Sequence, residues 1–325
     1  MDKKKLMKIP FFVILGLGLG LIIANSFIFS SSENVNQSKE IENEQTTIPY
    51  KVFQPYIPDT LSFCGEKVPL QNFDVYEALD YELIVNTYRH SSTLIYLKRA
   101  NRYFPEIEKI LKEKGIPDDM KYLCVAESGL ANVVSPAGAT GFWQFMKTTA
   151  GEYNMLVGRG IDERYNHTKS AIAATEYLHK AYKVFKSWTL AAASYNMGMG
   201  GLQKDIDYQK VNSYWDLHLN QETARYVYRI LALKLIMSNP KLYGFDIDEK
   251  YLYKEIKTQE IVVDTTISDL VEFAFEHGTN YKMLKYFNPW LTGKSLINPN
   301  KKEYKIVLPA KNARECMKQS KNNDE

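Results

Sequence analysis

Between about Leu61 and Phe245, apolar residues recur at helical spacing and are interrupted by glycine and proline. This pattern predicts a series of short helices, because strands would need apolar and polar residues in strict alternation. The predicted helices are 76–92, one with its apolar face at 104–111 that Gly115 ends, 117–128, a short one from about 147, 170–185, 188–197, and 221–238 with Asn220 as its cap. The expected fold class is therefore mainly α, with short helices around a cleft and glycines at the joins.

Glu127 lies in the last turn of one predicted helix, in a position that suits an acid catalyst. The Pro-Asp-Asp run at 117–119 opens this helix and Gly129 closes it. Helical spacing puts Glu127 on the face that carries Leu123 and Met120, which is the buried one. A carboxyl group there keeps its proton to higher pH than a surface glutamate does. The alternative is a helix-end glutamate in a salt bridge.

The N-terminus has the pattern of an export signal. Basic residues precede an apolar run from Ile9 to Ala24, and two polar residues interrupt it before 27–29. Small residues at 24–26 resemble a cleavage site, whereas the run to Phe29 is nearly long enough to span a bilayer, so cleavage and membrane anchoring through residues 9–29 both stay open. Either way, positive charge at the start predicts that the remainder is exported to the cell envelope, periplasmic or anchored facing the periplasm.

Composition adds two exclusions. A net charge of +3 gives no support for a nucleic-acid partner. The three cysteines, at 64, 124 and 316, are odd in number and have no metal-ligand spacing. We favour Cys124 as a small core residue, and a Cys64–Cys124 disulfide is the alternative outside the cell.

Five short motifs in and after the Glu127 helix carry a resemblance to a known family. They are Glu127-Ser128; Ser135-Pro136 with Gly138-Ala139; Gly141-Phe142-Trp143-Gln144; Ser194-Tyr195-Asn196 with Gly198; and Glu222-Thr223 with Tyr226. Their order and spacing resemble the lytic transglycosylases, which cleave bacterial peptidoglycan and have the lysozyme-like fold of goose-type lysozyme. Together with Asp162-Glu163-Arg164, they resemble the membrane-bound group with C-terminal lysin motifs. The resemblance covers most of residues 60–245.

Two positions depart from the family pattern. Phe142-Trp143 stands where Leu-Met is common, and Ser194 stands where Ala is common. Both changes keep the bulk or the small size of the usual residue, so they affect the details of the sugar subsites rather than activity.

The resemblance implies a mechanism with one carboxyl group. Hydrolases that cleave glycosidic bonds normally use two carboxylates. In this family a single glutamate, here Glu127, protonates the bond between N-acetylmuramic acid and N-acetylglucosamine. It then removes a proton from the muramic 6-hydroxyl, which closes a 1,6-anhydro ring, and the substrate's N-acetyl carbonyl is thought to assist. No metal and no cofactor are required.

The resemblance also implies a substrate-binding set around Glu127. Gln144 and Asn196 have amides suited to N-acetyl and hydroxyl groups, Tyr195 is suited to stacking on a sugar, and Tyr226 to a hydrogen bond with Glu127. Ser135 resembles the serine that the family aims at the catalytic carboxylate. Each has a structural alternative, as a core tyrosine or a helix cap. For Glu222, in the first turn of its helix, we prefer the structural role.

Beyond Asp246 the pattern changes to strand, helix, helix, strand. Residues 261–263 and 304–308 are predicted strands. The first helix starts at a Thr266-x-x-Asp269 cap and stops at Gly278, and the second ends at Asn288-Pro289. This order resembles a single lysin motif, a binder of N-acetylglucosamine chains, although Val263 replaces a usual glycine. Sugar binding and a purely structural cap remain alternatives.

The expected organisation is a lysozyme-like helical catalytic domain followed by a small α+β lysin-motif-like domain. The boundaries are 1–29 for the signal or anchor, 30–60 for a polar linker, 61–247 for the catalytic domain, 252–310 for the second domain and 311–325 for a tail. Peptidoglycan glycan strands are the expected partner. The competing functions are a catalytically silent wall-binding or scaffold protein, and a hydrolytic lysozyme with Glu152, Asp162 or Glu222 as its second carboxylate.

Overall fold

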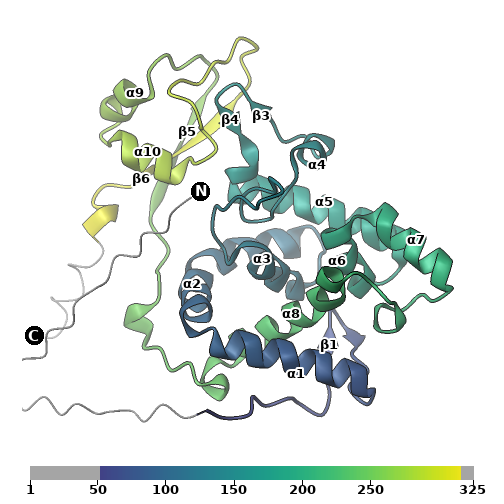
Figure 1. Ribbon diagram of the computed structural model, residues 1–325. Helices are drawn as coiled ribbons and strands as arrows, with labels where there is room; N and C mark the ends of the chain where they lie inside the picture. Colours follow the sequence, from purple (N-terminus) through teal and green to yellow (C-terminus); the bar gives the residue numbers. More distant parts are fainter. Residues whose placement is uncertain (1–51, 316–325) are drawn as a thin grey trace, which may run out of the picture. The chain divides into compact units, whose positions relative to one another are not determined.

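The computed structural model describes residues 52–315, and Figure 1 shows its course. The predicted signal or anchor lies outside the described residues, as does most of the predicted linker. No helix among residues 52–315 is long and apolar enough to cross a membrane.

The first part of the described chain is helical, as predicted. Its helices are α1 (Phe73–Tyr88), α2 (His90–Glu113), α3 (Lys121–Ser128), α4 (Lys147–Glu152), α5 (His167–Phe185), α6 (Trp188–Met197), α7 (Met199–Gln209) and α8 (Gln221–Ser238). Two short antiparallel hairpins accompany them: β1 (Ser62–Phe63) with β2 (Glu66–Lys67), and β3 (Val157–Gly158) with β4 (Ile161–Asp162). The mainly α fold class with a small α+β C-terminal part is confirmed.

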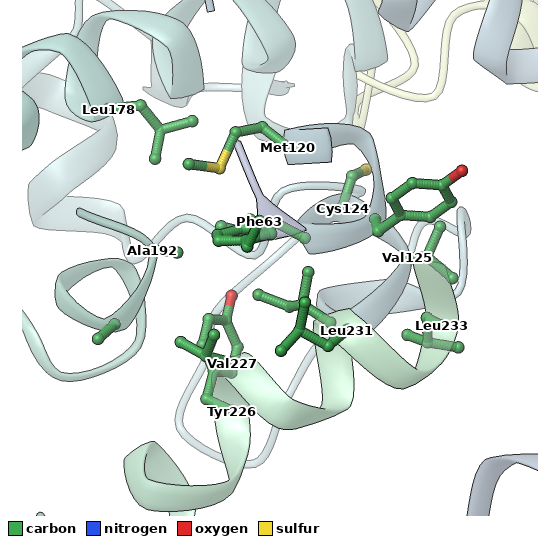
Figure 2. Packing of buried hydrophobic residues seen from close by; sticks show 14 of the residues in the cluster. Phe63, Met120, Cys124, Val125, Leu178, Ala192, Tyr226, Val227, Leu231 and Leu233 are labelled. Atoms are coloured by element: carbon green, nitrogen blue, oxygen red, sulfur yellow. The ribbon is translucent and has the colours of Figure 1, made fainter. Parts of the chain in front are cut away.

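The core of the helical part forms where α3 packs on α8. Met120, directly before α3, and Phe63 of β1 are fully buried in it, together with Val227 and Leu231 of α8. Figure 2 shows these four side chains converging. Helices α1 and α6 also pack on α8, so α8 is the central helix of this part (Figure 1). Its cap is Asn220, whose side chain accepts a hydrogen bond from the Thr223 N–H, as predicted.

One helix prediction was wrong, and one helix was not predicted. The predicted helix 76–92 is divided at Arg89, which has a non-helical backbone (φ −81°, ψ 55°), and residues 90–92 begin α2. The Thr93 hydroxyl donates to the Asn86 carbonyl at 2.6 Å across this break. Helix α7 was missed, because the glycines at 198, 200 and 201 suggested a loop, whereas only Gly198 has a positive φ.

The C-terminal module, residues 258–309, has the predicted order of elements. Strand β5 (Thr258–Val263) pairs antiparallel with β6 (Tyr304–Pro309), and α9 (Leu270–Glu276) and α10 (Tyr281–Phe287) lie between them in sequence. Buried Asn288 joins α10 to β6 by bonding both the N–H and the carbonyl of Val307. Asp269, rather than the predicted Thr266, caps α9, because its carboxylate accepts from the first-turn N–H groups.

Cys64 and Cys124 are both free thiols and Cys124 is fully buried, so the preferred interpretation of Cys124 as a core residue is confirmed.

The end of the predicted linker is packed: the Phe53 N–H donates to Tyr88 Oη, and Tyr243 Oη donates to the Tyr56 carbonyl. Residues from 53 onward therefore belong to the folded part.

Candidate active site

Glu127 sits in the last turn of α3, as predicted, and Gly129 makes this position possible. Gly129 ends the helix with a left-handed backbone (φ 59°). A Cβ there would lie 2.2 Å from the Tyr96 ring, and the Arg99 guanidinium donates to the Gly129 carbonyl at 2.9 Å. The chain must therefore turn sharply at this point, which leaves Glu127 at the end of a short, buried helix.

The surroundings of Glu127 raise its pKa into the neutral range. Desolvation raises the pKa of Glu127 to about 7, and the negative charge of Glu222 acts in the same direction. The Tyr226 hydroxyl, which donates to Glu127 Oε1, and the positive charge of Arg229 both oppose this rise in pKa. A carboxyl group with this pKa exists in both protonation states near neutrality, as an acid that later acts as a base requires.

One face of α8 supplies all three groups that act on Glu127. Glu222, Tyr226 and Arg229 are spaced four and three residues apart, which places them on the same side of the helix. Tyr226 is only 2% exposed, so the predicted hydrogen bond to Glu127 is made by a tyrosine that is also a core residue. Tyr226 is therefore both a core residue and a hydrogen-bond donor to Glu127.

The 133–145 loop carries Ser135 and Gln144, and both side chains hold the loop itself. The Ser135 hydroxyl accepts from the Ala139 N–H at 3.0 Å. The Gln144 amide donates to the Gly141 carbonyl at 2.7 Å and to the Val133 carbonyl at 3.0 Å. Within residues 52–315, neither side chain is hydrogen-bonded to Glu127.

Tyr195 lies near Glu127, and both its hydroxyl and its ring contact neighbouring residues. Its hydroxyl donates to the Trp143 carbonyl at 2.8 Å, and its ring meets the Tyr177 ring edge to face with centroids 5.0 Å apart. Desolvation first, and the charge of Glu127 second, raise the pKa of Tyr195 well above its ordinary value. Tyr195 therefore forms a wall beside the carboxyl group.

Asn196 connects α6 to the start of α8. Its Oδ1 accepts from the Thr223 hydroxyl at 2.7 Å, and its Nδ2 donates to Glu222 Oε1 at 3.2 Å. This contact holds Glu222 on the face of α8 that acts on Glu127.

The three candidate second carboxylates differ in their surroundings. Asp162 is engaged by the Arg164 guanidinium through two hydrogen bonds, at 2.9 and 2.7 Å. Glu152 is exposed. Glu222 is exposed as well, yet it is the one of the three whose charge raises the pKa of Glu127.

Sequence reasoning missed the Glu82 cluster. Glu82 of α1 is 1% exposed and accepts from Arg225 Nε at 2.6 Å, while Arg229 Nε lies 3.8 Å from its other oxygen. The two arginines are four residues apart on α8, so they lie on one face of the helix, where an anion between them offsets their mutual repulsion. The sequence offered that signal, but the partner lies on α1, far away in the chain.

Comparison with known proteins identifies the class of this domain. Residues 105–218 match the family model described as the transglycosylase SLT domain, and residues 259–312 match the soluble lytic transglycosylase C-terminal LysM-like domain. The chain therefore contains a transglycosylase SLT domain followed by a LysM-like domain. All the predicted site residues except Tyr226 lie inside the first match.

Individual relatives agree with these domains. The chain is similar to the membrane-bound lytic murein transglycosylase D of Escherichia coli strain K12, and to the protein of that name from E. coli O6:H1, with 28% identity over 267 residues in each case. The match covers 78% of this chain and 56% of each relative. The chain thus spans about half the length of the curated relatives it matches.

Proposed function

We propose that this protein is a lytic transglycosylase that cleaves peptidoglycan glycan strands in the cell envelope. The SLT domain and the similarity to membrane-bound lytic murein transglycosylase D support the reaction class. The observation that carries the proposal for this chain is the environment of Glu127: a half-buried carboxyl group whose pKa is about 7 and which accepts a hydrogen bond from a buried tyrosine.

In the first step Glu127 acts as the acid. Protonated Glu127 gives its proton to the oxygen between N-acetylmuramic acid and N-acetylglucosamine as that bond breaks. Loss of the proton leaves a carboxylate that the Tyr226 hydroxyl and the Arg229 charge stabilise. These two groups therefore favour the transfer, whereas desolvation keeps the acid protonated beforehand.

In the second step the same carboxylate acts as the base. It takes the proton of the muramic 6-hydroxyl, whose oxygen attacks the anomeric carbon and closes the 1,6-anhydro ring. Glu127 is thereby returned to its protonated form. The pKa near 7 suits both steps, since neither protonation state is strongly disfavoured at neutral pH.

The other predicted residues line the substrate site in this proposal. Ser135 and Gln144 shape the 133–145 loop, and the Gln144 Oε1 is the side-chain atom left to accept from an N-acetyl N–H. Tyr195 forms a wall of the site, and Asn196 holds Glu222 and the start of α8. In this role Tyr195 positions neighbouring groups instead of stacking on a sugar.

Hydrolysis is the second candidate function, and Glu222 is the observation that favours it. A lysozyme needs a second carboxylate near the acid, and the charge of Glu222 already acts on Glu127. We prefer the transglycosylase because Glu222 is exposed and its Oε1 accepts a hydrogen bond from Asn196.

Mass spectrometry of the products tests the proposal. Purified protein lacking residues 1–48 is incubated with peptidoglycan, with Glu127→Gln as the matched variant. The proposal predicts products lighter by one water than hydrolysis products, ending in 1,6-anhydromuramic acid, and a loss of at least about 1,000-fold in rate for the variant. Reducing ends would identify a hydrolase instead. Absence of product with retained wall sedimentation would identify a wall-binding protein.

A further inference from the structure

The C-terminal module shares its hydrophobic core with the hairpin of β3 and β4. Ile161 of β4 is 6% exposed and belongs to the same buried cluster as Leu291, Leu296 and Ile306 of the module. Backbone hydrogen bonds continue this contact: the Asp162 N–H donates to the Trp290 carbonyl at 2.8 Å. The module is thus packed on the helical part through core residues as well as joined to it by the chain (Figure 1).

Two glycines allow this close approach. The Gly293 N–H donates to the Gly160 carbonyl at 2.9 Å. A Cβ added at Gly293 would lie 3.0 Å from the Gly160 Cα, and one added at Gly160 would lie 3.3 Å from the Gly293 Cα. Larger residues would force the two backbones apart, so the glycines set the distance between module and hairpin.

Arg164, which follows β4 in sequence, contacts the 133–145 loop. Arg164 is buried, and its guanidinium is oriented by Asp162 through an ion pair at 2.7 Å. From there it donates to the carbonyl of Gly138, in the 135–139 turn, at 3.0 Å and to the carbonyl of Phe145, at the end of the loop, at 3.1 Å. The Arg164 carbonyl would lie 2.0 Å from a Cβ at Gly141, so the loop also packs tightly on this segment.

A second set of contacts fixes the chain between the two parts. Arg102 of α2 donates to the Lys254 carbonyl at 2.9 Å and to the Tyr286 hydroxyl of α10 at 3.1 Å. Asn101 donates to the Tyr253 carbonyl at 3.1 Å. The module is therefore attached at α2 as well as at the hairpin.

We infer that the C-terminal module positions the 133–145 loop of the candidate active site, through Ile161, Asp162 and Arg164. The module packs on β4, and β4 contains Asp162. Asp162 orients the Arg164 guanidinium, which donates hydrogen bonds to two carbonyls of the loop. The catalytic consequence rests on the proposed function, whereas the mechanical dependence of the loop on the module does not. Sugar binding by the module is not required, so the effect extends to substrates too short to reach it.

Hydrogen exchange and kinetics on the full chain test this inference. Gly293→Leu separates module and hairpin, and Thr292→Leu is the matched control, because it places the same leucine side chain at the neighbouring exposed residue. Ile161→Ala weakens the same contact from the other side. The reporters of the contact are the Asp162 and Gly293 amides, and the reporters of the loop are the Thr140 and Phe145 amides, which are bonded to each other's carbonyls.

We expect both sets of reporters to exchange at least about tenfold faster in Gly293→Leu and Ile161→Ala, with no change in Thr292→Leu. On a soluble fragment of two disaccharide units, kcat should fall roughly five- to tenfold with little change in KM, because the loop no longer keeps its geometry. Protection of the β5 and β6 amides shows whether the module itself stays folded.

Faster exchange at the contact with unchanged loop exchange would overturn the inference, whether or not the module has unfolded. Loop exchange that accelerates to the same extent in Thr292→Leu would overturn it as well. If the parent protein cleaves nothing, the proposed function fails, and the exchange data still decide whether the module holds the loop.

Discussion

Helix α8 contacts two glutamates, the buried Glu82 and the half-buried Glu127, through different kinds of side chain. Glu82 of α1 is 1% exposed and is paired with the two arginines at 225 and 229. Glu127 of α3 accepts a hydrogen bond from the neutral hydroxyl of Tyr226, and the charge of Arg229 lowers its pKa. The first glutamate joins α1 to α8 through its contacts with two arginines, whereas desolvation raises the pKa of the second to about 7.

The contrast also explains how one arginine contributes to both sites. Arg229 of α8 lies 3.8 Å from Glu82, and its charge also lowers the pKa of Glu127. Arg225 shares the contact with Glu82 but is not among the charges that act on Glu127. The two arginines therefore offer a way to change one site without the other.

The largest expected effect on stability comes from removing the structural glutamate. Glu82→Ala leaves two arginines without their anion at the contact of α1 with α8, and we expect the free energy of unfolding to fall by about 3 kcal/mol. Urea unfolding measures this change. The exposed Glu77 on the same helix provides the control, since Glu77→Ala should change stability by less than about 0.5 kcal/mol. Equal losses of unfolding free energy in Glu82→Ala and Glu77→Ala would contradict the structural role of Glu82.

Glu127→Gln should have the opposite effect, and only at higher pH. The pKa of Glu127 is raised in the folded state from 4.5 to about 7, so the stability linked to its proton is complete below about pH 4.5 and is lost as pH rises through about 7. The neutral amide avoids this loss, which is at most about 3 kcal/mol for this change in pKa, and we expect the variant to be more stable than the parent by about 2 to 3 kcal/mol at roughly pH 8. Urea unfolding of the variant and the parent at about pH 4.5 and at roughly pH 8 checks this. A difference in their free energies of unfolding that does not depend on pH would contradict it.

Tyr226→Phe should lower the rate by about tenfold, because the ring keeps its packing while the carboxylate loses its hydrogen bond. That bond lowers the pKa of Glu127, so the fall in kcat/KM at alkaline pH should move to higher pH. Tyr228→Phe on the same helix is the control, with neither change expected. An unchanged pH profile in Tyr226→Phe would argue against a contact that matters to the reaction.

The smallest expected effect separates the two arginines. Arg229→Met removes a charge that lowers the pKa of Glu127, so the alkaline fall in kcat/KM should move upward by a fraction of a pH unit, about 0.5. Arg225→Met weakens the Glu82 contact but should leave the pH profile in place. A shift of equal size in both variants would show that it arises from general destabilisation.

Local signals in the sequence predicted much of this fold. The caps at Gly129 and Asn220, the bounds of α6 and α8, and the order of elements in the C-terminal module follow from residues that act within a few positions of one another. The exceptions were also local in origin. Helix α7 was not predicted because Gly200 and Gly201 have weak helix propensity, yet both lie in its first turn.

Long-range contacts could not be predicted from one sequence. The pattern placed Glu127 on a buried face, and the family resemblance brought it together with Tyr226. Nothing in the sequence joins Glu82 to Arg225, or Ile161 to the core of the C-terminal module, because these partners lie more than a hundred residues apart. The local roles of Ser135 and Gln144 in the 133–145 loop also depend on its folded shape.

The most direct test of the account is the titration of Glu127 itself. Infrared difference spectra recorded across neutral pH, with Glu127→Gln as the subtracted reference, isolate the carboxyl signal of this one residue. The account predicts a protonated carboxyl band that disappears with a midpoint near pH 7. A midpoint at the ordinary value of about 4.5 would contradict the claim that α3 and α8 hold Glu127 as an acid at neutrality.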